Sequence, residues 1–167
     1  MEIVSERQAK NSSLVERVTP FSEIRECSIS GSKSVHARID LMAGQVLSKF
    51  GAKEILDRPS YLTLQINQSQ HIMLDPEWLQ YINHSCDPNL FFNYEKGEAI
   101  VLKPIQAGEE IAFFYPSTEW SMDRAFDCHC KSWNCIGRIQ GAEFLSSDIL
   151  SNYQLSPYIQ GMILEGI

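Results

Sequence analysis

The sequence lacks the features of a membrane, secreted or nucleic-acid-binding protein. No apolar run approaches the length of a membrane span. Residues 1–20 carry six charged residues and no apolar segment of the kind that a signal peptide requires. The formal net charge is −7 at pH 7, whereas general nucleic-acid binding favours a basic surface. We therefore expect an intracellular protein, cytoplasmic or nuclear, without direct nucleic-acid or membrane binding; its acidity is compatible with a basic protein or peptide partner.

Two further absences narrow the fold. The chain has no glycine-rich strand-to-helix turn of the dinucleotide-binding kind, which argues against a Rossmann-like fold. It also has no internal repeat and no low-complexity segment. With 167 residues, of which 44% are hydrophobic, the chain is expected to form one soluble domain that buries a core without disulfides.

Short strand-like stretches dominate the rest of the chain. Alternating or β-branched apolar residues separated by turn residues predict strands at 21–29, 35–41, 46–50, 61–66, 71–74, 90–94, 99–102 and 111–115. Helical signals are few. Residues 53–57 suggest one helical turn before Pro59, and Asp75 is placed to cap a short helix.

The C-terminal tail has the clearest helical spacing, at Leu145, Ile149, Leu150 and Tyr153, and Ser156-Pro157 interrupts it. We therefore predict a mostly β fold of several small sheets with a short C-terminal helical tail. The predicted parts are a weakly ordered segment at 1–20, a main domain at 21–125, a cysteine-rich knot at 126–141 and the tail at 142–167.

Five cysteines are present, an odd number that does not suggest a disulfide framework. Three of them form a C-x-C-x4-C cluster: Cys128, Cys130 and Cys135. Closely spaced thiolates suit zinc, which needs a fourth ligand for tetrahedral coordination. The candidates are Cys27, Cys86, His84 and His129.

Cys86 is the favoured fourth ligand because it lies in an unusually polar stretch with a specific tertiary role. His129 lies between two ligands, so its side chain should point away, and Cys27 is most simply a small core residue. An all-cysteine site leaves no open coordination position, so the zinc would be structural. The alternative is a set of reduced thiols without metal.

The polar stretch is Asn83-His84-Ser85-Cys86-Asp87-Pro88-Asn89. By itself it is also compatible with an ordinary turn before a strand. Together with two later motifs, however, it resembles the SET-domain protein-lysine methyltransferases. Residues 83–89 resemble the central signature of that family, residues 108–115 (Gly-Glu-Glu-Ile-Ala-Phe-Phe-Tyr) resemble its next signature, and the cysteine cluster followed by Gly137 resembles its zinc-binding post-SET segment.

The resemblance implies the SET-domain fold, with small curved β-sheets around a pseudoknot. It implies a pocket for S-adenosylmethionine (SAM), a structural zinc ion, and a narrow aromatic channel through which a lysine of a protein or peptide substrate enters. The 50–75 region and the tail would then carry peptide specificity. The resemblance does not identify the substrate, the degree of methylation or the oligomeric state.

The resemblance also implies roles for individual residues. Tyr115 matches the catalytic tyrosine, although a core aromatic is the plain alternative. Asn83 and His84 match SAM-contacting positions. Phe113 falls in the lysine channel, where its lack of a hydroxyl leaves room for a water or an added methyl group and so permits higher methylation states. Two aromatic residues keep two interpretations each: Tyr61 lines the channel or packs in a strand, and Trp133 covers the adenine or packs on the zinc loop.

The chain departs from the family pattern in three places. The family's Gly-x-Gly motif, which contacts SAM, falls at Ser32-Lys33-Ser34 in this chain, so both glycines are replaced by serine. We predict that these three residues and Val35 form the corresponding wall of the SAM pocket. The aspartate before the catalytic tyrosine is Phe114, and the family's frequent arginine falls at Gln80. Two alternative functions therefore accompany the enzyme hypothesis: a SET-like binding module without catalysis, and a SET-fold SAM enzyme acting on a small molecule.

Overall fold

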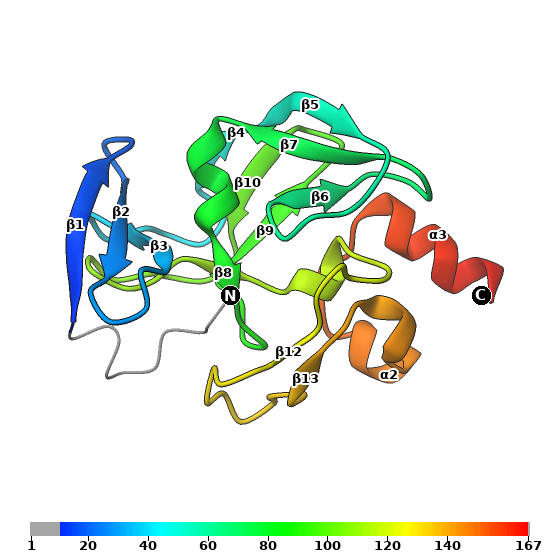
Figure 1. Cartoon of the computed structure of the whole chain (residues 1–167). Helices are drawn as coiled ribbons and strands as arrows, with labels where there is room; N and C mark the ends of the chain where they lie inside the picture. Colours follow the sequence, from blue (N-terminus) through cyan, green and yellow to red (C-terminus); the bar gives the residue numbers. More distant parts are fainter. Residues whose placement is uncertain (1–10, 167) are drawn as a thin grey trace.

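The computed structural model describes residues 11–166, and most of its regular structure is short strands (Figure 1). Three sheets have three antiparallel strands each. They are β1(Ser12–Arg17)-β2(Ser22–Cys27)-β3(Lys33–Ala37), β4(Val46–Lys49)-β10(Glu98–Val101)-β9(Leu90–Asn93) and β5(Gly51–Leu56)-β7(His71–Asp75)-β6(Thr63–Gln65). The predicted mostly β fold of small sheets is therefore confirmed.

Two shorter pairs complete the strands: β8(Asn83–His84) with β11(Ala112–Phe113), and β12(Phe126–Asp127) with β13(Arg138–Ile139). The helices are short. They are the 3-10 turns η1(Glu77–Tyr81), η2(Tyr115–Ser117) and η3(Ala142–Phe144), and the α-helices α2(Ser147–Leu150) and α3(Pro157–Glu165). Among the described residues, no helix combines the length and apolar character needed to cross a bilayer.

The predicted hairpins are present, and several local predictions are wrong. β6 pairs with β7 and β9 pairs with β10, as expected. Residues 53–57 form no helical turn, because residues 53–56 belong to β5, which pairs with β7. Asp75 caps no helix, since it ends β7 and η1 begins at Glu77. The tail spacing yields only the four-residue α2, because Leu145 lies in extended backbone after η3.

The predicted weakly ordered segment at 1–20 is wrong for residues 12–17. These residues form β1, which pairs along its length with β2. The strand is nearly all exposed, so it carries no buried apolar face that the sequence pattern could reveal. The remainder of that prediction, residues 1–10, lies outside the described part of the chain.

The β8–β11 pair brings the two central motifs side by side. The strands run parallel, with Asn83 opposite Ala112 and His84 opposite Phe113. Because side chains alternate along extended backbone, Phe113 and Tyr115 enter the main core whereas Phe114 points to the other side. This register places the 108–115 motif directly against the Asn-His motif.

The tail has a core of its own. Phe114, Ala142, Leu150 and Ile159 form a second buried cluster, separate from the main one. The chain enters this region through Gly141, whose φ of +123° disfavours other residues; a Cβ at this position would also clash with the Trp120 carbonyl group. Figure 1 shows α2 and α3 on the side of the molecule opposite β1–β3.

Candidate active site and metal centre

One cavity of about 560 Å³ joins the main predicted site regions. Its wall is formed by residues 31–33, 59–64, 79–83 and 121–126 together with Leu74, Phe113, Tyr115 and Glu119. Segments from opposite parts of the sequence therefore share one space, with the residues before and at the start of β3 on one side and the 59–64 loop region on another. A cavity of this size suits a small organic ligand or a side chain.

The structure brings some of the predicted residues to this cavity and leaves others outside. Those that line it are Ser32, Lys33, Tyr61, Asn83, Phe113 and Tyr115. Those that do not line it are Ser34, Val35, His84 and Trp133. Trp133 is 94% exposed, so it does not pack on the cysteine loop. Val35 is fully buried in the main core.

Asn83 is held from two sides. Its Nδ2 donates to the Lys33 carbonyl at 3.2 Å and to Glu110 Oε1 at 2.9 Å. Burial raises the pKa of Glu110, and the hydrogen bond from Asn83 opposes that shift. The side-chain orientation of Asn83 is thus set by the protein itself, and it joins β8 to the segment that replaces the glycine pair.

The Tyr115 phenol is buried beside Phe113, with ring centroids 4.7 Å apart. Its hydroxyl donates to the Ile82 carbonyl at 3.1 Å. Burial, followed by the charges of Glu110 and Glu119, raises the pKa of Tyr115 well above its ordinary value. The phenol therefore stays protonated at neutral pH and serves as a hydrogen-bonding group in the cavity wall.

Ser34, at the second position of the replaced glycine pair, turns away from the cavity. Its hydroxyl lies 2.9 Å from His36 Nε2, and His36 Nδ1 lies 2.9 Å from the Gly108 carbonyl. Since a carbonyl only accepts, Nδ1 carries the proton and Nε2 accepts from Ser34. Burial lowers the pKa of His36, in keeping with a neutral ring. The Ser34 hydroxyl is thus buried and hydrogen-bonded in the core, so it does not narrow the cavity.

Ser32 and Lys33 do reach the cavity. The Lys33 ammonium lies 4.8 Å from the centroid of the Tyr81 ring, an attractive cation–π arrangement. This contact places a positive charge at the cavity wall near Asn83. The segment that replaces the first part of the Gly-x-Gly motif therefore places the positive charge of Lys33 at the cavity wall.

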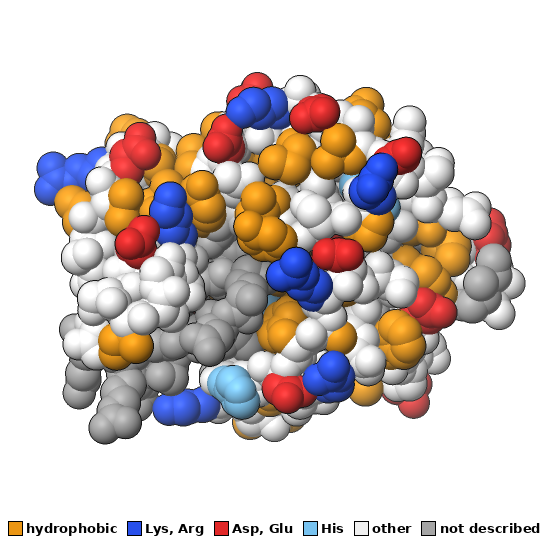
Figure 2. All heavy atoms as spheres, in the orientation of Figure 1, with side chains coloured by type: hydrophobic (Ala, Val, Ile, Leu, Met, Phe, Trp, Pro, Cys, Tyr) orange, Lys and Arg blue, Asp and Glu red, His pale blue; other side chains and the backbone are white. Residues whose placement is uncertain are grey.

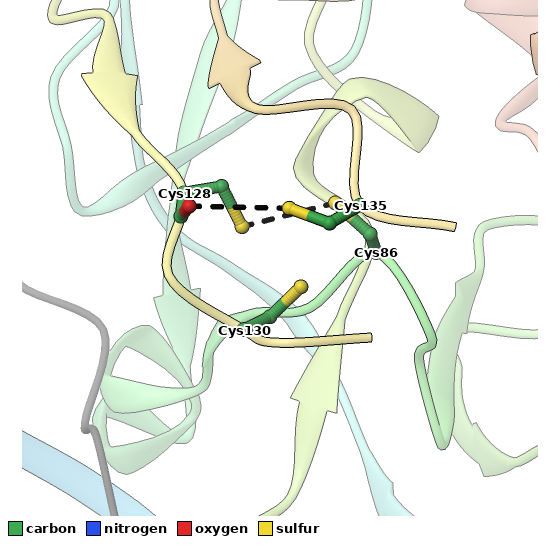
Figure 3. Close-up of side chains that lie close together, drawn as sticks. All are labelled: Cys86, Cys128, Cys130 and Cys135. Carbon is green, nitrogen blue, oxygen red and sulfur yellow. Dashed lines mark hydrogen bonds between the residues drawn. The ribbon is translucent and has the colours of Figure 1, made fainter. Parts of the chain in front are cut away.

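The four predicted zinc ligands converge outside this cavity. Figure 3 shows Cys128, Cys130 and Cys135 of the knot pointing toward Cys86, which follows β8. The four sulfur atoms lie within 4.8 Å of one another, and those of Cys86 and Cys128 are 3.8 Å apart. Tetrahedral zinc with Zn–S bonds of about 2.3 Å requires sulfur atoms about 3.8 Å apart, so the donor set fits zinc.

The other candidates for the fourth ligand do not join this group. His129 is exposed, and Cys27 is a buried core residue. The loop that carries three of the cysteines is closed by the β12–β13 pair, in which Phe126 lies opposite Ile139. The Cys128 amide donates to the Gly137 carbonyl at 2.6 Å inside this hairpin.

The thiols differ in acidity. Burial raises the pKa of Cys86 to about 12 and also raises that of Cys128. Burial acts in the same direction on Cys130, but hydrogen bonds from Ser132 outweigh it and lower the pKa to about 6. Two sulfurs therefore keep their protons at neutral pH until a cation displaces them, as zinc binding does.

His84 links the cysteine cluster to Tyr115, the predicted catalytic residue. The Tyr115 amide donates to His84 Nδ1 at 3.1 Å, so the ring proton is on Nε2. Nε2 lies 3.3 Å from Cys86 Sγ and donates to it. Burial lowers the pKa of His84 to about 3, which keeps the ring neutral. His84 therefore orients a predicted zinc ligand, although its side chain does not line the cavity.

The tail explains the departure at Phe114. Its ring stacks on Tyr153 with centroids 3.6 Å apart and planes 4° apart. The Tyr153 hydroxyl and Asn134 Nδ2 both donate to the Cys86 carbonyl, each at 2.8 Å. An aspartate at 114 would enter an apolar cluster, whereas phenylalanine stacks on Tyr153, which is bonded to the backbone of Cys86.

Glu119 is the main cavity residue that sequence reasoning missed. It lies in the cavity wall four residues after Tyr115, and its Oε2 accepts from the Gln65 amide at 2.9 Å. Burial raises its pKa to about 8, against the opposing bonds from Gln65 and Thr118. The available signal was a lone acidic residue in an otherwise uncharged stretch, residues 111–122.

Comparison with known proteins agrees with these observations. The family model of the SET domain matches residues 2–116. Methyltransferase flvH of Aspergillus flavus is 36% identical over 132 residues, which cover 78% of this chain and 74% of flvH. Histone-lysine N-methyltransferase Set2 of Drosophila melanogaster is 44% identical over 68 residues, which are 37% of this chain and 3% of Set2.

A solved structure of KRYPTONITE in complex with mCHG DNA and SAH is similar over 64% of this chain and 26% of its own, with 20% identity and a TM-score of 0.48. The family match covers more than half of the chain, and the three sequence motifs lie together around one cavity and one cysteine cluster. The chain belongs to the SET-domain family.

Proposed function

We propose that the protein is a SAM-dependent methyltransferase that modifies the side-chain amine of a lysine in a protein or peptide. The observation that carries the proposal is the shared cavity. Asn83 and the Ser32–Lys33 segment, which match the methyl-donor side in this family, line the same space as Tyr115 and Phe113, which match the acceptor side. Donor and acceptor would therefore meet beside the Tyr115 hydroxyl.

SAM would supply an activated methyl group on a sulfonium sulfur. The contribution of the protein is then to hold a neutral amine in line with that methyl group, since positioning supplies much of the rate in such a displacement. The Phe113 and Tyr115 rings give the cavity an apolar wall, which favours the neutral form of a lysine amine. The protonated Tyr115 hydroxyl would orient the amine.

The cysteine cluster would serve this site indirectly. Four thiolates leave no open position on a zinc ion, so the metal would be structural. The ion would hold Cys128 and the chain before it, residues 121–126, which form part of the cavity wall. It would also hold Cys86, to which His84 and the tail are bonded.

A second candidate acceptor is a small-molecule amine. Methyltransferase flvH, whose name specifies no substrate, matches over 74% of its own length, whereas the match to the histone-lysine methyltransferase Set2 covers only 3% of Set2. The face drawn in Figure 2 does not favour a nucleic acid as partner, because Lys and Arg lie among Asp and Glu there without a continuous basic area. This is consistent with a net charge of −7.

The first test is calorimetric titration of the zinc-loaded protein with SAM. We expect binding at one site, because Ser34 points into the core and Ser32 leaves the cavity open. A folded, zinc-loaded protein that binds no SAM at millimolar concentration would favour the non-catalytic binding module instead.

The second test is the Tyr115→Phe variant. Removing the hydroxyl takes away the group that orients the amine, and we expect turnover to fall roughly 100-fold or more with SAM affinity little changed. Tyr158→Phe in α3 is the matched control and should keep full activity. Wild-type turnover by Tyr115→Phe would contradict the assignment. Comparing a basic protein such as histone with free L-lysine as acceptor separates the two candidate substrates.

A further inference from the structure

Glu119 is a carboxyl group held in a fixed position in the cavity wall. Its backbone amide donates to the Tyr115 carbonyl at 3.1 Å, so it lies one turn after the catalytic tyrosine. Its Oε2 accepts from the Gln65 amide at 2.9 Å, and Gln65 Oε1 in turn accepts from the Trp120 amide at 2.9 Å. The hydrogen bond to Gln65 fixes the carboxyl, and the second bond fixes Gln65.

The groups that face this carboxyl are hydroxyls and amides. Thr118 hydrogen-bonds to it, and its charge acts on the phenols of Tyr94 and Tyr115. The other carboxyl that acts on Tyr115 is Glu110, which Asn83 already engages. Within residues 11–166, no lysine or arginine forms an ion pair with Glu119. A carboxylate at this position therefore lacks a positive partner from the protein.

A protonated amine in the cavity would supply that partner. Lysine side chains have an ordinary pKa of about 10.4, so the acceptor arrives as an ammonium ion at neutral pH. The amine can attack a methyl group only after it loses a proton. An ammonium ion and a carboxylate enclosed together stabilise each other, and proton transfer between them removes both charges from an apolar space.

We propose that Glu119 is a catalytic residue that binds the protonated acceptor amine and takes its proton before methyl transfer. This inference rests on the proposed function. In the first step the N–H bond breaks, its electrons stay on nitrogen, and the proton forms an O–H bond with the carboxylate. In the second step the nitrogen lone pair attacks the methyl carbon of the sulfonium donor, and the C–S electrons remain on sulfur. Glu119 then returns its proton to solvent.

The other ionisable groups near the cavity are less suited to this step. The Tyr115 phenol has a pKa raised well above its ordinary value, so it is not ionised at neutral pH. Glu110 does not line the cavity. Asp123 lines it, but its side chain is 45% exposed and lies 3.9 Å from Arg124. Glu119 has a pKa near 8, close to the working pH of a general base.

The pH dependence of kcat/KM tests the role, with Nα-acetyl-L-lysine amide as the acceptor. If Glu119 must be ionised and the free amine protonated, wild-type kcat/KM rises through a pKa of about 8 and falls through a pKa of about 10.4. Glu119→Gln should lower the maximum roughly 100-fold and change the bell into a single rise toward high pH. Identical profiles for the two proteins would overturn the proposal.

Two further variants serve as controls for the Glu119→Gln pH profile. Asp123→Asn removes a carboxyl from the same cavity wall with the same change of net charge, and it should keep the bell-shaped profile. Glu119→Asp keeps a carboxyl but withdraws it by one methylene, so it should keep the bell with a lower maximum. If Glu119→Gln does not fold, as judged by circular dichroism, loss of the bell in Glu119→Asp would count against the proposal.

A binding measurement tests Glu119 without turnover. At pH 7 the free carboxyl is mostly protonated, so n-butylamine binding should release about one proton from it. Titrations in buffers of different ionisation enthalpy count this proton, and Glu119→Gln should release none. Equal proton release would overturn the inference. Proton release without methyl transfer to any amine would overturn the proposed function alone, and methyl transfer with equal release and equal pH profiles would overturn the inference alone.

Discussion

The cavity wall and the cysteine cluster lie on either side of the same short strand, β8, yet they are stabilised differently. In the cavity, two of the central polar side chains already have protein partners: Asn83 donates to Lys33 and Glu110, and the Tyr115 hydroxyl donates to Ile82. In the cluster, four sulfurs face one another, and burial raises the pKa of two of them. A bound cation would favour the thiolate forms of these sulfurs and draw them together.

The difference indicates which part of the site depends on an added component. The cavity is preorganised by internal hydrogen bonds, so changing one of its side chains should alter chemistry more than stability. If the cluster holds a zinc ion, as proposed, changing one of its four cysteines should alter stability first. His84 connects the two, because it accepts from Tyr115 and donates to Cys86. Loss of a bound ion should therefore shift His84 and, through its hydrogen bond with the Tyr115 amide, alter the cavity wall.

The largest effect is expected from Cys86→Ser. Loss of one of four thiolates weakens zinc binding, and we expect less than one zinc per chain and a fall in the free energy of unfolding of about 4 kcal/mol or more. Elemental analysis and guanidinium unfolding measure both quantities, and a chelator should reproduce the effect on the wild type. Cys27→Ala, outside the cluster, should keep its zinc. Full zinc content in Cys86→Ser would exclude Cys86 as a ligand.

Phe114→Asp should have the next largest effect, and it restores the residue of the family pattern. The new carboxylate would replace a ring that is 2% exposed and stacked on Tyr153. An uncompensated buried charge should lower the free energy of unfolding by about 3 kcal/mol or more. Phe144→Asp is the control, because Phe144 is 54% exposed and should change stability little. Similar losses in both variants would argue against a specific role for the stack.

Ser34→Gly should have the smallest effect, and it restores one glycine of the family's pair. It removes the hydrogen bond to His36, so we expect a loss of about 1 kcal/mol in the free energy of unfolding. SAM affinity should not change, because Ser34 does not line the cavity. The SAM affinity of Ser32→Gly serves as the comparison, because Ser32 lines the cavity. Tighter SAM binding by Ser34→Gly would show that the hydroxyl obstructs the pocket.

Much of the fold was predictable because its signals are local. The β9–β10 and β6–β7 hairpins follow from alternating residues around turns, and both were predicted. β5 was not predicted, because Lys53 and Glu54 in an exposed strand have no alternating apolar pattern, and only pairing with β7 makes the segment extended. β1 was missed for the same reason: its residues are nearly all exposed, and pairing with β2 holds them.

The candidate site was predictable where residue type alone restricts the chemistry. Three closely spaced cysteines and a fourth in a polar stretch pointed to one metal site, and the structure brings these four together. Ser34 and Trp133 are different, since their positions in a motif did not reveal that one turns into the core and the other into solvent. Glu119 was missed because a single acidic residue has no motif around it.

The sequence by itself determined the family, the order of its motifs and the identity of the sulfur ligands, because these depend on residue types at short spacing. Tertiary structure alone decided which side chains share the cavity. The 59–64 region, Asn83, Tyr115 and Glu119 meet there only because β8 pairs with β11 and Gln65 of β6 bonds to Glu119. Such contacts join residues up to 54 positions apart, and no local pattern records them.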